Sequence, residues 1–158
     1  MTGFDEWLPR RVAAADALLL DDIVVPVSPE TSRGLVDVLR SWWEHLAKFE
    51  ADLLLPPDDH SIWGAHDYVA GLIIRDRLAG AISRLDPTLA GRIDSAVSEV
   101  DRRFTDFTEH DDDGCTGRVD GRVDPGRGWW WRRVPIRGPI REELRLHYGH
   151  QGAPAGQE

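Results

Sequence analysis

The chain of 158 residues is 41% hydrophobic and 30% charged, which is the composition of a globular domain with a packed core. Its single cysteine, Cys115, excludes an internal disulfide and a cysteine-rich zinc site. No apolar run approaches the roughly 20 residues of a membrane-spanning helix, and the N-terminus shows no signal-peptide pattern. We expect one cytoplasmic domain, residues 1–158, without a cofactor.

Charge is unevenly spread along the chain, whose formal net charge is −9. Residues 1–117 carry 11 basic and 23 acidic side chains, whereas residues 118–158 carry 8 basic and 5 acidic ones. An acidic body argues against general nucleic-acid binding, because that affinity depends on neutralising phosphates. It favours another protein, basic in charge, as the partner, since complementary charge steers association.

Two helices separated by an extended segment are predicted in the first third of the chain. Residues 9–22 are rich in Ala and Leu and begin at a proline, which the first helical turn tolerates. The β-branched, proline-interrupted segment 23–27 predicts extended backbone. Ser28 is a suitable N-cap for a helix over 29–55. Large apolar residues recur in it every three or four positions, as one stripe: Leu35, Leu39, Trp42, Leu46, Phe49 and Leu53.

Two further helices complete the predicted body. The third follows a cap at Asp59 or Ser61, and the fourth begins with Asp86 as N-cap and a proline in its first turn. Short connections favour antiparallel neighbours. The predicted fold class is therefore all-α, an up-and-down helical bundle of about four long helices with its core at residues 9–110.

The remainder of the chain has a different composition. Residues 111–128 are rich in Gly, Asp and Arg, which predicts an exposed acidic loop. Residues 129–149 predict a Trp-rich extended arm and a short helix, with Pro139 in its first turn and Gly149 at its end. The tail, residues 150–158, is expected to be disordered.

The segment EHDDDGCTGRVD partly matches a calcium-binding loop. Aligned on its glycine, it offers four carboxylate ligands: Glu109, Asp111, Asp113 and Asp120. The loop begins with Glu instead of Asp, ends with Asp instead of the longer Glu, and lacks an exit helix. The main interpretation is therefore a metal-free acidic loop that pairs with nearby Arg, and a calcium site is the alternative.

The segment RSWWEH, with Arg40 and His45, lies in a long predicted helix and has a small polar residue after the Arg. This spacing resembles the Arg-x4–6-His pair of ribonucleases in the HEPN superfamily. The resemblance implies that the pair would handle the scissile phosphate. The sequence has four such spacings, whereas chance alone gives roughly two, because the chain has 18 Arg and 6 His.

Three adjacent tryptophans and two arginines are the most unusual feature of the sequence: Trp129, Trp130, Trp131, Arg132 and Arg133. Trp and Arg are enriched at interface hot spots, so these residues are predicted to bind a partner. In an extended segment, alternation puts Trp129 and Trp131 on the side opposite Trp130. Trp130 would then face the partner if the other two pack on the bundle, whereas burial of all three would make the arm a structural clamp.

The leading functional hypothesis is a non-enzymatic, acidic protein-binding module. In its most specific form it is an immunity- or antitoxin-type inhibitor of a basic partner protein, motivated by small size and strong acidity. One alternative is the helical-bundle ribonuclease that uses Arg40 and His45. Another is a small-ligand binder with a Trp-lined pocket.

Overall fold

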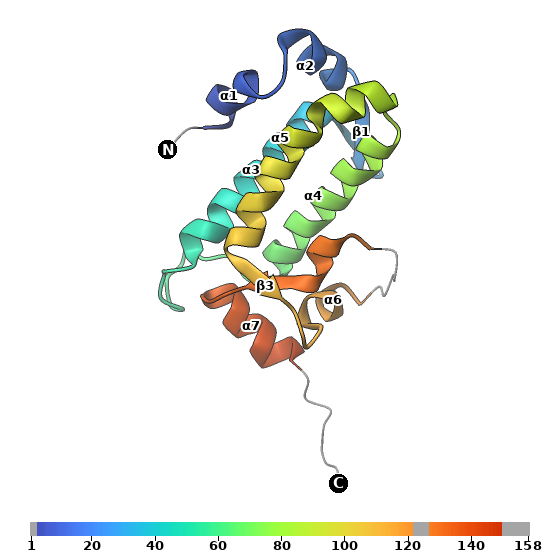
Figure 1. The fold of residues 1–158 in the computed structure, drawn as a ribbon. Helices are drawn as coiled ribbons and strands as arrows, with labels where there is room; N and C mark the ends of the chain where they lie inside the picture. Colours follow the sequence, from blue (N-terminus) through green and yellow to red (C-terminus); the bar gives the residue numbers. More distant parts are fainter. Residues whose placement is uncertain (1–2, 122–126, 150–158) are drawn as a thin grey trace. The chain divides into compact units, whose positions relative to one another are not determined.

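The computed structural model describes residues 3–121 and 127–149. In this part the protein is mostly helical and also has two small antiparallel sheets of two strands each, so an all-α class is too narrow (Figure 1). None of the described helices combines the length and the apolar character needed to cross a membrane. The predicted disordered tail, residues 150–158, lies outside the described residues.

The elements alternate between long helices and short connecting pieces, with η marking a 3-10 helix. Helices α3, α4 and α5 have 18, 19 and 20 residues, whereas α2 has only 8. In chain order the elements are α1 (Phe4–Trp7), η1 (Leu8–Arg10), α2 (Ala14–Asp21), β1 (Val24–Ser28), β2 (Thr31–Gly34), α3 (Leu35–Asp52), α4 (Ala65–Ser83), α5 (Pro87–Asp106), β3 (Thr108–His110), α6 (Cys115–Asp120), η2 (Trp129–Arg132), β4 (Arg133–Pro135) and α7 (Pro139–Tyr148).

The chain forms two compact units. Unit 1 comprises Met1–Leu46 and Ile73–Phe104, and unit 2 comprises Ala47–Leu72 and Thr105–Glu158. Helices α3, α4 and α5 therefore contribute residues to both units. The expectation that residues 1–158 form a single domain stays a prediction.

The N-terminal segment of unit 1 is not the continuous helix predicted for residues 9–22. The short helix η1 comes first, and α2 begins only at Ala14. Between them Val12 is buried, and the Arg11 guanidinium forms a 2.5 Å ion pair with Glu99 on α5. Packing of these side chains outweighs the local helix propensity of the Ala- and Leu-rich sequence.

A hairpin takes the place of the first turns predicted for the second helix. The segment predicted to be extended forms β1, as expected, but β1 pairs with β2 in an antiparallel ladder from Val24 opposite Gly34 to Ser28 opposite Thr31. Helix α3 therefore begins at Leu35, and Ser28 is not its cap. Pairing with β2 gives backbone groups of this segment hydrogen-bond partners, which outweighs a local helix-start signal.

The apolar stripe predicted for this helix is confirmed in α3. Its five members within the helix are each at most 2% exposed: Leu35, Leu39, Trp42, Leu46 and Phe49. The sixth, Leu53, lies just beyond the end of the helix. The stripe starts where α3 starts, so its periodicity located the helix better than the cap signal did.

In unit 1, helices α3, α4 and α5 lie side by side (Figure 1). Between them is a partly buried cluster of polar side chains. The indole Nε1 of Trp42 donates to Asp101 Oδ1 at 3.0 Å. The guanidinium of Arg75 donates to both oxygens of the same carboxylate, at 2.9 and 2.8 Å. One side chain from each helix therefore meets at Asp101.

The two caps predicted for the later helices have different outcomes. Asp86 caps α5 as predicted, because its Oδ2 accepts the backbone N–H groups two and three residues further on, at 3.1 and 3.2 Å. Asp59 instead accepts the N–H and hydroxyl of Ser61 at 2.8 and 2.5 Å. Neither residue caps α4, which begins at Ala65.

The segment predicted as an exposed acidic loop contains a helix and buried residues. Within residues 111–128, α6 is present, and Asp111, Cys115 and Thr116 are buried. The carboxylate of Asp111 accepts the backbone N–H groups of Cys115 and Thr116 at 3.2 and 2.8 Å. This capping interaction explains how a carboxylate can be buried at the start of α6. Residues 122–126 lie outside the described part of the chain.

The Trp-rich arm is not extended as predicted. Its tryptophans form η2, in which the N–H of Trp131 donates to the carbonyl of Gly128 at 3.1 Å, and only β4 is extended. Because a 3-10 turn takes about three residues, the alternation expected of a strand is lost. Trp130 and Trp131 are buried, while Trp129 is 39% exposed, so the predicted sides of the three rings are wrong.

Candidate functional site

Helix α7 supplies one wall of a groove in unit 2. The short terminal helix was predicted, with Pro139 in its first turn. Gly138 sets its start, because its φ of 94° lies in the left-handed region and a Cβ would stand 3.0 Å from the Leu53 backbone. Ile140 and Leu144, four residues apart, are both buried and fix the orientation of the helix within the unit.

The segment 57–64 supplies the opposite wall and is tied to α7 by a cap. Oε1 of Glu143 accepts the backbone N–H of Ala65 at 2.9 Å, so a side chain of α7 caps α4. Asp67 adds a second cap by accepting the N–H of Gly64 at 3.0 Å. Glu143 lies 78 positions from the residue it caps, which is why no local pattern could reveal it.

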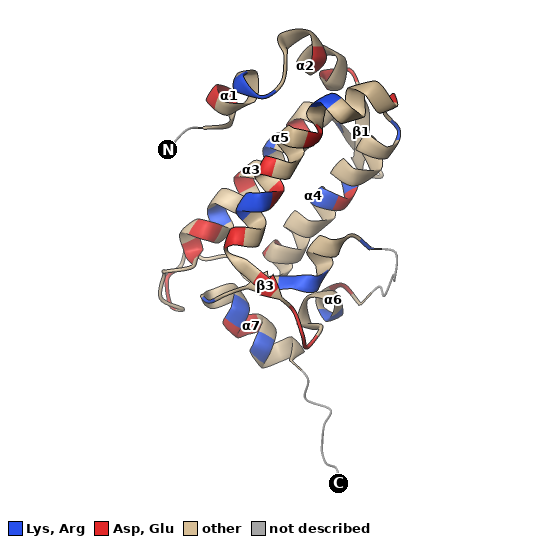
Figure 2. Cartoon of the chain, viewed as in Figure 1, with Lys and Arg blue, Asp and Glu red and all other residues tan. Residues whose placement is uncertain are grey.

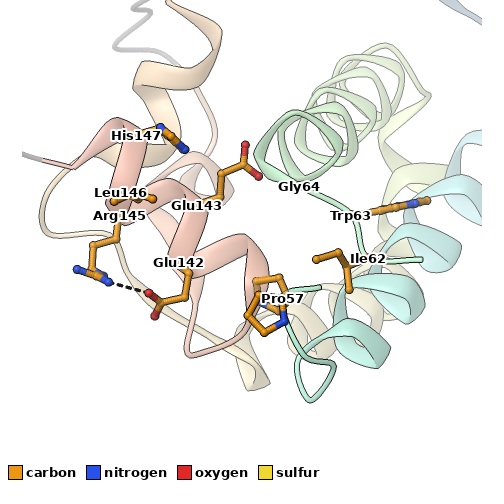
Figure 3. Close-up of a pocket in the computed structure, with 10 residues that line it drawn as sticks. Pro57, Ile62, Trp63, Gly64, Glu142, Glu143, Arg145, Leu146 and His147 are labelled. Atoms are coloured by element: carbon orange, nitrogen blue, oxygen red, sulfur yellow. Dashed lines mark hydrogen bonds and ion pairs between the residues drawn. The ribbon is translucent and has the colours of Figure 1, made fainter. Parts of the chain in front are cut away.

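The space between these walls, called the α7 groove below, has a volume of about 420 Å³. That volume lies in the range of ligand-binding clefts. Pro57 and Ile62 face α7 from the opposite wall, whereas the ring of Trp63 extends away from it (Figure 3). On α7 itself, Leu146 is 61% exposed and lines the groove. With only one tryptophan in its lining, the groove gives little support to a Trp-lined ligand pocket.

Charged side chains of α7 surround the apolar part of the groove. Glu142 and Arg145 form an exposed ion pair at 2.7 Å, marked by the dashed line in Figure 3. The hydrogen bond from Arg145 lowers the pKa of Glu142, and the same bond raises the pKa of Arg145. Both side chains are therefore charged at neutral pH. Glu143 and His147 also line the groove.

The five predicted partner-binding residues of the arm have different surroundings. Trp130 and Trp131 are buried, Arg133 is half-buried, and Trp129 and Arg132 are exposed. Arg133 donates to the hydroxyl and the carbonyl of Thr108 at 2.8 and 2.7 Å, so its donors serve the fold of unit 2. Trp129 and Arg132 are the members that reach the surface, and their role in binding stays a prediction.

Three carboxylates of the partial calcium-loop match line one pocket of about 340 Å³ in the described structure, but they are not arranged as a metal site. The four are Glu109, Asp111, Asp113 and Asp120. Glu109 pairs with Arg141 at 2.6 Å, Asp120 pairs with Arg127, and Asp111 caps α6. Within residues 3–121 and 127–149, no three His, Cys, Asp or Glu side chains are placed to hold a metal ion. The described structure thus gives the calcium alternative no support.

The residues of the ribonuclease alternative have structural partners. Arg40 donates to Asp5 at 2.5 Å, and its guanidinium lies 4.7 Å from the ring centroid of Phe4. The bond to Asp5 raises the pKa of Arg40. His45 Nδ1 lies 2.7 Å from the carbonyl oxygen of Ser41. Arg40 thus holds helix α1, and the ribonuclease hypothesis remains an untested prediction.

The groove was missed at the level of sequence, although its helix was predicted. Leu146 follows Leu144 by two positions, which is a rotation of about 200° around a helix. It therefore lies opposite the buried face of α7, and a large apolar residue there was the available signal. The other wall, residues 57–64, is too distant in the sequence for such a pattern.

Comparison with protein-family models, with curated proteins and with solved structures finds no match for this chain. The assignment of a function therefore rests on the fold and on the geometry of the groove.

Proposed function

We propose that this chain is a non-enzymatic protein-binding module that recognises a basic partner protein through the α7 groove. In its most specific form, it is an immunity- or antitoxin-type inhibitor that acts in the cytoplasm and presents the groove on an up-and-down helical bundle. The observation that carries the proposal is Leu146, 61% exposed, in a groove whose rim is charged.

The α7 groove has the two layers of a protein interface. Energetically dominant contacts in such interfaces are anchors that fill a pocket, and a polar rim surrounds them. Here Pro57, Ile62 and Leu146 offer an apolar surface to an anchor side chain. Glu142 and Glu143 lie beside that surface and would meet a positive charge next to the anchor.

The charge of unit 2 favours a basic partner. Its two sequence segments carry 15 acidic and 9 basic side chains, compared with 13 and 10 in unit 1. Both signs occur on α7, so recognition at the groove depends on local pairing as well as on the overall charge (Figure 2). Exposed charge pairs are screened by salt, which makes the proposed complex weaker at high ionic strength.

The proposal predicts that a charge placed in the α7 groove abolishes partner binding. The tagged full chain and its Leu146→Glu variant are used at low salt to capture partners from native lysate, and binding of the purified partner is then measured. We expect a stoichiometric basic partner whose affinity falls at least about tenfold in the variant, because burying an unpaired charge is unfavourable. Leu54→Glu is the matched control, since Leu54 is 79% exposed in the same unit and does not line the groove.

Two results would contradict the proposal. One is the absence of any stoichiometric partner at low salt. The other is an equal loss of affinity in Leu146→Glu and Leu54→Glu, which would place the interface elsewhere. Trp129→Ala in the same assay measures the contribution of the exposed end of the arm, because Trp129 is 39% exposed and outside the groove lining.

A further inference from the structure

Unit 1 contains a second, smaller pocket that the proposed function does not use. Its volume is about 270 Å³, slightly below the range of pockets for drug-sized molecules. Strands β1 and β2 and helices α3 and α4 each contribute to it. The lining residues are Val27, Arg33, Val38, Ser41, His45 and Ile74.

The walls of this pocket combine apolar surface with a few polar groups. Val27, Val38 and Ile74 come from three different elements and form the apolar part. Ser41 adds a hydroxyl, and His45 lies one turn further along α3. An apolar pocket with a few convergent polar groups is the usual composition of a small-molecule site.

The imidazole of His45 is held in a defined orientation. Its Nδ1 lies 2.7 Å from the carbonyl oxygen of Ser41, which can only accept a hydrogen bond. Nδ1 therefore carries the proton when the ring is neutral. This bond fixes the imidazole as a rigid part of the pocket wall rather than a rotating side chain.

Arg33 is the charged group at this pocket. It lies on β2 and is exposed, and its guanidinium forms no hydrogen bond or ion pair with any residue that the structure describes. Arg40 provides the contrast, because Asp5 and the ring of Phe4 engage its guanidinium. Arg33 and His45 therefore line this pocket together, and Arg40 is not among its lining residues.

We propose that this pocket binds a small carboxylate with a compact apolar body. The guanidinium of Arg33 binds the carboxylate, since its planar pair of donors matches two carboxylate oxygens. The Ser41 hydroxyl donates a further hydrogen bond, and Val27, Val38 and Ile74 enclose the apolar body. A bare inorganic anion would leave these three apolar side chains without a contact. The site is independent of the α7 groove and lies wholly within unit 1.

The test uses isovalerate and benzoate as probes and the uncharged isovaleramide and benzamide as matched controls. Methyl signals of Val27, Val38 and Ile74 are followed by carbon–proton NMR of the full chain. We expect saturable shifts with at least one carboxylate at up to about 10 mM and none with its amide. Arg33→Gln should weaken binding at least about tenfold, and Ser41→Ala about fivefold.

Arg77→Gln is the control variant, because Arg77 is also exposed in unit 1 but does not line the pocket. It should bind the carboxylate as the unchanged chain does. The proposal is overturned if neither carboxylate shifts the three methyl signals, or if the amide binds equally well. It is also overturned if Arg33→Gln and Arg77→Gln behave alike, or if inorganic phosphate binds and the carboxylates do not.

Discussion

Buried polar side chains in the two units form hydrogen bonds with different kinds of partner. In unit 1, Arg75 and Trp42 donate to the carboxylate of Asp101, so side chains satisfy one another. In unit 2, several buried side chains bond to backbone groups instead. The hydroxyls of Tyr68 and Thr116 donate to the carbonyl of Arg133 at 2.8 and 3.2 Å, and Asp111 accepts N–H groups of α6.

The difference is clearest between the long helical segments of unit 1 and the short elements of unit 2. The long helices of unit 1 satisfy their own backbone groups along most of their length, so polar side chains between them have to find each other. Unit 2 contains α6, η2 and two three-residue strands, and short elements leave most of their terminal N–H and C=O groups open. Buried polar side chains in unit 2 supply hydrogen-bond partners for some of these groups.

The largest effect is expected from Asp101→Ala in unit 1. Removing the carboxylate deletes both hydrogen bonds from buried Arg75 to Asp101 and the bond that the indole of Trp42 donates to it. Breaking a buried ion pair from one side costs about 3–5 kcal/mol. The free energy of unfolding, measured by urea titration, should fall by that amount.

Asp94→Ala is the control, because Asp94 is exposed on the same helix, α5. It should change the free energy of unfolding by no more than about 0.5 kcal/mol. If Asp101→Ala were as mild as this control, the cluster would not be the point at which the three helices of unit 1 are held together.

A smaller effect is expected from Asp111→Ala in unit 2. The variant loses two hydrogen bonds to the N–H groups that start α6, and a capping carboxylate is worth about 2 kcal/mol. Hydrogen exchange of the Cys115 and Thr116 amides should accelerate together with the fall in stability. Asp113→Ala, at an exposed position in the same loop, is the control and should leave both amides protected. Unchanged exchange in Asp111→Ala would show that the cap is dispensable.

Local patterns predicted those parts of the fold whose cause is local. The stripe of α3 and the Asp86 cap of α5 depend on residues a few positions apart, and both are present. The predicted start of α3 was wrong, because pairing of β1 with β2 outweighs the cap signal at Ser28. The predicted start of α4 was wrong, because the side chain that caps this helix, Glu143, comes from α7.

The candidate site was less predictable than the fold. The sequence drew attention to the tryptophans of the arm, yet η2 turns Trp130 and Trp131 inward and leaves Trp129 exposed. An exposed groove needs two walls, and the walls of the α7 groove are far apart in the sequence. Composition identified an unusual segment, but only tertiary packing determined which side chains reach the surface.

The smallest effect on the free energy of unfolding is expected from Tyr68→Phe, and this effect depends on pH. At neutral pH the free energy of unfolding should fall by about 1 kcal/mol, because the Arg133 carbonyl still accepts a hydrogen bond from the Thr116 hydroxyl. Burial, and secondarily the charge of Asp111, raise the pKa of Tyr68 well above its ordinary value. The neutral phenol is thus favoured by folding, and its contribution is complete below about pH 10 and is lost as the pH rises through the folded-state pKa.

Above about pH 10, the unchanged chain should therefore lose stability more steeply than Tyr68→Phe. The difference between their free energies of unfolding should become smaller as the pH rises. Urea unfolding at neutral and at alkaline pH measures this difference. Tyr148→Phe is the control, since the chain has 2 tyrosines and Tyr148 is not fully buried. A constant difference at both pH values would mean that Tyr68 ionises equally in the folded and unfolded chain. Water would then hydrogen-bond to the Tyr68 hydroxyl in the folded chain. The buried side chains of unit 2 would contribute less to pairing its backbone groups than the geometry indicates.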